Sequence, residues 1–219
     1  MLFPNVNDGD TLVFALPPDK QTKQLLSLMN VKVVVKKIPP DACKREILVS
    51  VPPASGLQDV LRELSSGAPG ETIVAKPDCS QQLWLCGGFA LRSVTWAEDF
   101  FEELRRGEHP LCIIEGPRVG LRSATEEIIK ITRRAEKLGK EPTGFPKAYL
   151  SPKELMSELL RISPATKYVI SCHMKGFGVP KEDREQYERF PEVLKVIGRT
   201  DSAANQKYLS GLIRKLYPQ

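Results

Sequence analysis

The stretch that decides the fold runs from Gln82 to Gly116 and reads QLWLCGGFALRSVTWAEDFFEELRRGEHPLCIIEG. Its apolar periodicity switches from the spacing of a strand to that of a helix and back, and the adjacent pair Gly87-Gly88 is typical of a tight turn. The predicted elements are, in order, a strand at residues 82–86, a turn at 87–88, a strand at 89–94, a helix at 96–106 and a strand at 111–115.

Two β-branched runs precede this stretch. VKVVVKKI (31–38) and REILVSV (45–51) flank the turn-like residues PPDACK, so they predict a β-hairpin. Leu57, Leu61 and Leu64 then recur at helical spacing, which predicts a helix with one apolar face. The order strand, strand, helix, strand, strand, helix, strand is that of a β-grasp, or ubiquitin-like, fold.

The rest of the chain has a different character. Residues 1–30 predict an N-terminal arm with a short strand and a short helix, and residues 117–219 predict a mostly helical module. Helices are expected at 123–138, 151–162, 181–190, 191–197 and 202–216, while residues 168–174 fit either a strand or a helical turn. The expected fold class is therefore α+β, with a β-grasp module at residues 31–116 followed by a basic helical module.

Composition limits where the protein works. No apolar run approaches the roughly 18 to 20 residues that span a bilayer, and the start MLFPNVNDGD lacks the pattern of a signal peptide. The five cysteines are odd in number and widely spaced, which is typical of reduced thiols rather than of a disulfide framework. We expect a soluble protein of the cytoplasm, with the nucleus as the alternative.

Charge is distributed unevenly along the chain. Residues 1–116 hold 12 Lys and Arg against 15 Asp and Glu, whereas residues 117–219 hold 20 against 12. The excess positive charge of the C-terminal half fits an acidic partner, although solvated helix faces explain such a surplus as well.

The residues of the opening stretch resemble the Ras-binding domain of phosphoinositide 3-kinase catalytic subunits. In that ubiquitin-like family a strand that ends in a Cys-Gly turn, here Cys86-Gly87, leads to a short strand, an aromatic-bearing helix and a closing apolar strand. The likeness covers residues 31–116, and the chain has no kinase region. It implies a small GTPase as an acidic partner, paired edge to edge with the second strand of the hairpin. The basic residues that match this site are Lys36, Lys37, Lys44, Arg45 and Arg62.

Single-stranded nucleic acid is the alternative partner. A basic helical half can neutralise phosphates, and aromatic side chains can stack on bases. The candidate contacts are Lys130, Arg133, Arg134, Lys137, Lys140, Lys175, Lys181, Arg214 and Lys215, with Tyr168 and Phe177 as stacking groups. Glutamates lie between these residues in the sequence, so the positive charges do not form a continuous track.

The sequence offers little for catalysis. The chain has two histidines, and His173 adjoins Cys172, so on a strand the two side chains point to opposite faces. His109 and Cys112 with that pair lack the spacing of a zinc site, and the glycine loops lack the Lys-Ser/Thr of a P-loop. We therefore expect a non-catalytic binding protein with no metal and no cofactor, and the oligomeric state stays open.

Overall fold

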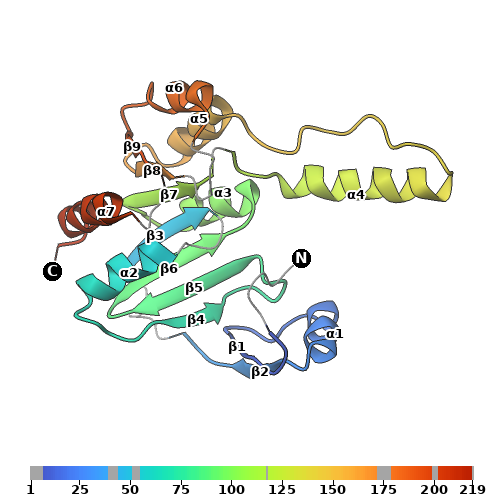
Figure 1. Cartoon of the computed structure of the whole chain (residues 1–219), viewed down its shortest axis with the longest axis horizontal. Coiled ribbons are helices and arrows are strands. Elements are labelled where there is room, and N and C mark those ends of the chain that lie inside the picture. The colour runs from blue at the N-terminus through green and yellow to red at the C-terminus, as the bar shows by residue number, and fades with distance from the viewer. Residues whose placement is uncertain are drawn as a thin grey trace.

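The structure is a computed structural model that describes residues 7–38, 44–50, 55–116, 118–171, 179–198 and 202–218. Within them the chain forms one nine-stranded sheet and seven helices (Figure 1). The strands are β1 (Thr11–Phe14), β2 (Lys32–Val35), β3 (Arg45–Ser50), β4 (Glu71–Val74), β5 (Gln81–Cys86), β6 (Phe89–Val94), β7 (Leu111–Glu115), β8 (Lys167–Ser171) and β9 (Val193–Val196). The helices are α1 (Lys20–Leu28), α2 (Ser55–Leu64), α3 (Ala97–Arg106), α4 (Arg122–Lys137), α5 (Pro152–Ile162), α6 (Lys181–Tyr187) and α7 (Ala203–Leu216).

The sheet is mostly parallel and has the order β2-β1-β4-β5-β6-β3-β7-β8-β9. Only the pairings that β5 makes with β4 and β6 are antiparallel. The interior strand β7 is buried along its whole length. Such continuous burial is expected of a parallel strand that is covered by helices on both faces.

Two layers of helices cover the two faces of the sheet (Figure 1). Cys112 and Ile114 of β7 pack with α3, α5 and α6, whereas Leu111 and Ile113 pack with α2 and α7. Successive residues of a strand point to opposite faces, so one strand contributes to both cores. The fold is thus a mixed α/β sandwich of helices around a sheet.

The hairpin predicted from residues 31–38 and 45–51 is wrong. β2 pairs with β1, β3 pairs with β6 and β7, and four strands separate β2 from β3. Burial explains the separation, because residues 47–50 are fully buried and suit the centre of the sheet, whereas β2 is largely exposed and suits its edge. A β-grasp led by this hairpin is therefore not what these strands form.

The C-terminal half is not a purely helical addition. Its strands β8 and β9 continue the sheet beside β7, so the sheet crosses the boundary predicted near residue 116. Val193–Val196 is a strand where a short helix was predicted at residues 191–197. A run this short has no clear period, and parallel pairing with β8 decides its conformation.

Helix α4 projects from the body of the protein, and residues 138–150 run back beside it (Figure 1). We call α4 with residues 138–150 the arm. Its two ends meet at the bridge between Gly120 and Tyr149, where the Leu121 amide donates to the Ala148 carbonyl at 2.8 Å. Among the described residues, no helix combines the length and apolarity needed to cross a lipid bilayer.

Candidate functional site

The topology points to the carboxyl edge of the parallel strands. The connection after β3 leads to α2 on one face, whereas the connection after the neighbouring β6 leads to α3 on the other face. In open parallel sheets ligands bind outside the carboxyl ends of strands whose connections diverge in this way. A site is therefore expected near the ends of β3, β6 and β7.

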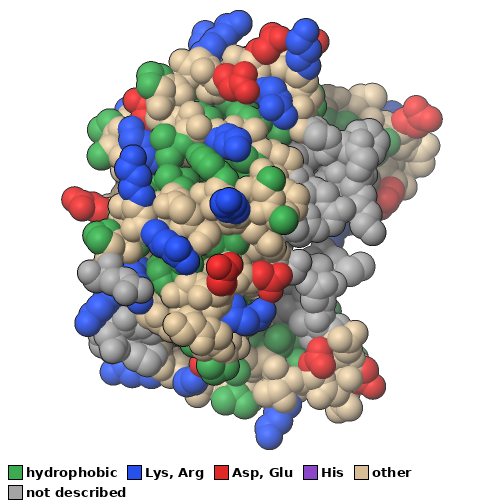
Figure 2. All heavy atoms as spheres, turned by 60° about the vertical axis from the view of Figure 1, so that its left-hand side comes forward, with side chains coloured by type: hydrophobic (Ala, Val, Ile, Leu, Met, Phe, Trp, Pro, Cys, Tyr) green, Lys and Arg blue, Asp and Glu red, His purple; other side chains and the backbone are tan. Residues whose placement is uncertain are grey.

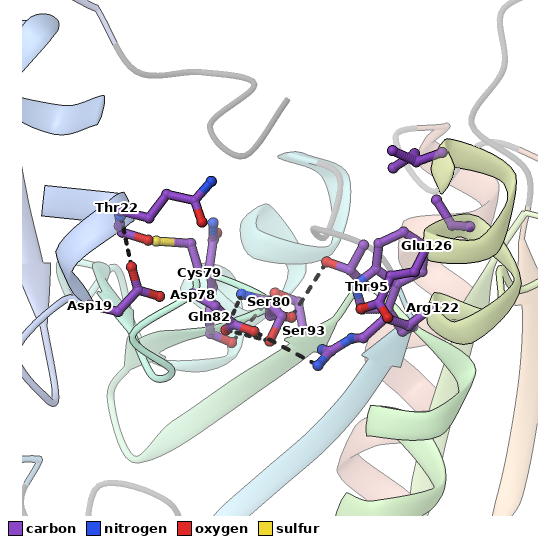
Figure 3. A pocket seen from close by; sticks show the side chains of 14 residues that line it. Asp19, Thr22, Asp78, Cys79, Ser80, Gln82, Ser93, Thr95, Arg122 and Glu126 are labelled. Atoms are coloured by element: carbon purple, nitrogen blue, oxygen red, sulfur yellow. Dashed lines mark hydrogen bonds and ion pairs between the residues drawn. The ribbon is translucent and has the colours of Figure 1, made fainter. Parts of the chain in front are cut away.

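A cleft of about 510 Å³ lies at this edge, between α1, the β4–β5 loop, the end of β6 and the first turns of α4 (Figure 3). Its volume falls in the range of small-ligand pockets. The lining residues are Asp19, Gln21, Thr22, Asp78, Cys79, Ser80, Gln82, Ser93, Thr95, Trp96, Arg122, Thr125, Glu126 and Ile129.

Arg122, at the start of α4, is the only cationic side chain among the described residues of that lining. Its guanidinium contacts Asp99 and lies 3.8 Å from Asp78. Asp99 is buried and also accepts a hydrogen bond from Lys76 at 2.9 Å. This network fixes the arm against α3 and leaves the charge of Arg122 largely neutralised.

Asp78 and Ser80 form a compact turn at the floor of the cleft. Asp78 Oδ1 accepts hydrogen bonds from the Ser80 amide at 3.1 Å and the Ser80 hydroxyl at 2.7 Å. Burial alone would raise the pKa of Asp78, but these bonds and the charges of Arg122 and Lys76 outweigh it and leave the pKa below its usual value. Asp78 is therefore an anion at neutral pH.

Cys79 lies in the same turn and is not activated. Burial, followed by the charges of Asp78 and Asp19, raises the pKa of its thiol to about 12. The nucleophile of a thiol reaction is the thiolate, which is scarce at neutral pH when the pKa is this high. The described lining also holds no histidine that would act as a base for Cys79 or Ser80.

The cleft is acidic overall. Asp19, Asp78 and Glu126 bring three carboxylates against the one guanidinium of Arg122, while Trp96 and Ile129 add apolar surface. Figure 3 shows Asp19 and Thr22 on the side of α1, opposite Arg122 and Glu126 of α4. Such a lining suits a basic group with an apolar part. Across the described chain, no group of three or more His, Cys, Asp or Glu is placed to hold a metal ion.

The five residues predicted to bind a protein do not form one site. Lys36 and Lys37 follow the edge strand β2, whereas Lys44 and Arg45 lie at the start of β3, with four strands in between. Lys36 is paired with Glu71 at 2.6 Å. Because β2 and β3 pair with other strands, they do not present these charges together on one hairpin edge.

The residues predicted to bind nucleic acid divide into separate groups. Lys130, Arg133, Arg134, Lys137 and Lys140 are exposed on the arm, whereas Arg214 and Lys215 end α7 on the opposite side of the protein (Figure 1). Lys181 begins α6 and lies 3.8 Å from Glu185. Tyr168 is fully buried, so it cannot stack on a base. Lys175 and Phe177 lie outside the described residues, as do Cys172 and His173.

A stack of three side chains joins Arg45, at the start of β3, to Tyr217, just after α7. The Arg45 guanidinium lies 4.1 Å from the centre of the Phe89 ring, and that ring meets Tyr217 edge-on with centroids 6.5 Å apart. The Tyr217 hydroxyl donates to the Glu46 carbonyl at 2.7 Å. The start of β3 is thereby held against the end of α7.

This stack creates a surface that sequence patterns did not reveal. We call it the α7 basic face, and it consists of Lys44, Arg45, Lys207, Arg214 and Lys215. Figure 2 turns this side of the protein forward, and Lys and Arg side chains outnumber Asp and Glu across its middle. The contacts that Tyr217 makes with Glu46 and Phe89 are long-range, so no local signal indicates them.

Comparison with known proteins gives no family. No protein-family model matches the chain, and no curated protein matches it either.

Proposed function

We propose that the protein binds single-stranded nucleic acid on the α7 basic face. One observation carries this proposal: α7 bears Lys207, Arg214 and Lys215 with no acidic residue along Ala203–Leu216. Stacking of Arg45 on Phe89, next to Tyr217, brings the charge of Arg45 to the end of this helix.

Described side chains leave most of the charges of this face without an ionic partner. In the part of the chain that the structure describes, no ion pair engages Lys44, Lys207, Arg214 or Lys215. Helix α6 shows the contrast, because its Lys181 and Arg184 each lie within 4.0 Å of a glutamate. Unpaired cations gain most from phosphates, whose binding releases condensed counterions.

An acidic protein such as a small GTPase is the second candidate for the same face. Lys44 and Arg45 belong to the set predicted to bind a protein, and they are part of this surface. Edge-to-edge pairing is not open to β3, however, because β6 and β7 occupy both of its edges. A protein partner would have to bind through side chains, whereas phosphates need only the exposed cations.

The test is fluorescence anisotropy of a labelled single-stranded RNA of mixed sequence, titrated at several salt concentrations. We expect binding at about 50 mM salt. The logarithm of the association constant should then fall linearly with the logarithm of the salt concentration. The double variant Arg214→Glu with Lys215→Glu is expected to lower the affinity about tenfold or more. The slope of log K against log salt should become shallower by about 1.4, since each phosphate contact with a single strand contributes about 0.7 to it.

A matched double reversal, Lys20→Glu with Lys23→Glu, tests whether net charge alone explains the loss. Both lysines are exposed on α1 and belong to neither basic set. This control is expected to bind as the wild type does. An absence of binding at low salt, or equal losses in both double variants, would overturn the assignment to the α7 basic face.

A further inference from the structure

The arm carries charge opposite to that of the cleft. Its outer half presents Lys130, Arg133, Arg134, Lys137 and Lys140, with Glu136 and Glu141 as the acidic residues among them. We call residues 130–141 the arm tip. The cleft, in contrast, has three carboxylates and one guanidinium that is already paired. The two surfaces are electrostatically complementary.

The arm also exposes apolar side chains that the protein does not cover. Leu138 is 60% exposed at the tip, and Phe145 is 49% exposed on the returning segment. The cleft offers apolar surface of its own, since Trp96 and the exposed Ile129 line it beside the carboxylates. Tip and cleft therefore share a pattern of an apolar centre flanked by charge.

The tip cannot enter the cleft of its own chain. Arg122, Thr125, Glu126 and Ile129 belong to the first turns of α4 and form a wall of that cleft. Lys137 lies on the same helix, about 16 Å beyond Glu126 at 1.5 Å per residue. A straight helix that forms the wall of the cleft directs its own tip away from it, so the contact must come from another molecule.

The root of the arm is fixed firmly enough to present the tip. Glu98 of α3 accepts hydrogen bonds from the amides of Arg122 and Ser123 at 3.0 and 3.2 Å. The bridge between Gly120 and Tyr149 closes the base of the arm. A rigid projection loses little conformational freedom when it binds.

We propose that the arm tip of one molecule docks in the acidic cleft of a second copy of this chain. Arg134 and Lys137 then face the carboxylates of the cleft, and Leu138 covers its apolar lining. The donor and acceptor surfaces differ, so the contact is heterologous and repeats from copy to copy, into a row or a ring. This assembly does not depend on the nucleic-acid proposal.

The experiment is light scattering coupled to gel filtration, on nuclease-treated protein over a range of protein and salt concentrations. We expect the mass to rise with protein concentration and to fall as salt rises, because the contact is partly ionic. The arm variant is Arg134→Glu with Lys137→Glu. The cleft variant is Gln21→Lys with Glu126→Lys, which adds positive charge to both walls without removing a described hydrogen bond.

Each variant alone is expected to stay monomeric, because each molecule lacks one of the two surfaces. An equimolar mixture is expected to form a two-chain complex and nothing larger, since the intact arm of the cleft variant enters the intact cleft of the arm variant. General charge repulsion does not produce this recovery. Far-ultraviolet circular dichroism checks that both variants fold.

Lys153→Glu with Arg189→Glu is the matched control, because both residues are exposed outside the arm and the cleft. It is expected to assemble as the wild type does. A wild type that stays monomeric at every concentration, an assembly that survives in the arm or the cleft variant, or a mixture of the two variants that stays monomeric would each overturn the proposal.

Discussion

Arg92 of β6 holds Glu46 of β3 through two parallel hydrogen bonds, from Nε to Oε1 at 2.8 Å and from Nη2 to Oε2 at 3.0 Å. The same guanidinium lies 3.4 Å from a carboxylate oxygen of Glu103 on α3. The three side chains are largely withdrawn from solvent. This network ties the two central strands to the helix that covers them.

We predict that Arg92→Leu destabilises the protein strongly. The substitution leaves the carboxylates of Glu46 and Glu103 inside the protein without the guanidinium, and breaking a buried pair from one side lowers stability by about 3 kcal/mol or more. Urea unfolding followed by circular dichroism measures the change. Arg161→Leu is the control, because Arg161 pairs with Glu158 at the exposed end of α5. This substitution is expected to leave the urea midpoint of unfolding unchanged.

The turn between β5 and β6 supplies a second prediction. Gly87 has φ of +53°, and a Cβ at this position would lie 2.4 Å from the Ser65 Cβ. Gly139 has a similar φ of +60° but open space around it. Gly87→Ala and Gly139→Ala both introduce backbone strain of about 1 kcal/mol, and only the first adds a clash. Gly87→Ala should therefore unfold at a clearly lower urea concentration than Gly139→Ala. Equal urea midpoints for the two variants would contradict a clash with Ser65.

The same turn shows what local sequence determines. The strands, the Gly87-Gly88 turn, helix α3 and β7 were all predicted in the right order, and the structure confirms them. Alternation, helical spacing and adjacent glycines with positive φ act over a few residues. The helix predicted at residues 123–138 is confirmed as α4 for the same reason.

Strand partners were not predictable, because they depend on contacts between distant residues. A run such as REILVSV reads the same whether it ends a hairpin or lies between two parallel strands. Its continuous burial on both faces, seen only in the fold, distinguishes the two. The cleft was missed likewise, since Asp19, Asp78 and Arg122 lie far apart in sequence.

Capping patterns had mixed outcomes. Ser151 and Glu154 form a capping box at the start of α5, with both hydrogen bonds present. Thr95 with Glu98 and Ser123 with Glu126 have the same Ser/Thr-x-x-Glu spacing but form no capping box, because Trp96 and Leu121 occupy the N-cap positions without side-chain bonds. Glu98 instead caps the start of α4 from a different helix.

Cys79 provides a chemical prediction. Its thiol lines the cleft, but its pKa of about 12 leaves almost no thiolate at pH 8. We expect iodoacetamide to modify Cys79 slowly in the folded protein and readily in urea, as measured by mass spectrometry of the peptide. Asp78→Asn removes one of the charges that raise the pKa, so it should accelerate the reaction. Rapid modification of the folded wild type would contradict the protected state.

Glu98 makes the attachment of the arm dependent on pH. Burial alone would raise its pKa, but hydrogen bonds from the Arg122 amide, its own amide and Ser123 outweigh burial and lower the pKa below the usual value. A lowered pKa in the folded state means that the stabilisation is complete above the unfolded value of about 4.3 and disappears as the pH falls through the folded value.

We therefore predict that the wild type and Glu98→Gln differ in thermal midpoint at neutral pH and converge in acid. The glutamine side chain of the variant stays neutral over this pH range. The difference in thermal midpoint between the two proteins should therefore disappear only when the wild-type carboxylate is protonated. Amide chemical shifts of Arg122 and Ser123 should follow the same titration in the wild type and stay flat in the variant. A difference in midpoint that persists unchanged to the lowest pH would show that the carboxylate charge is not what holds the start of α4.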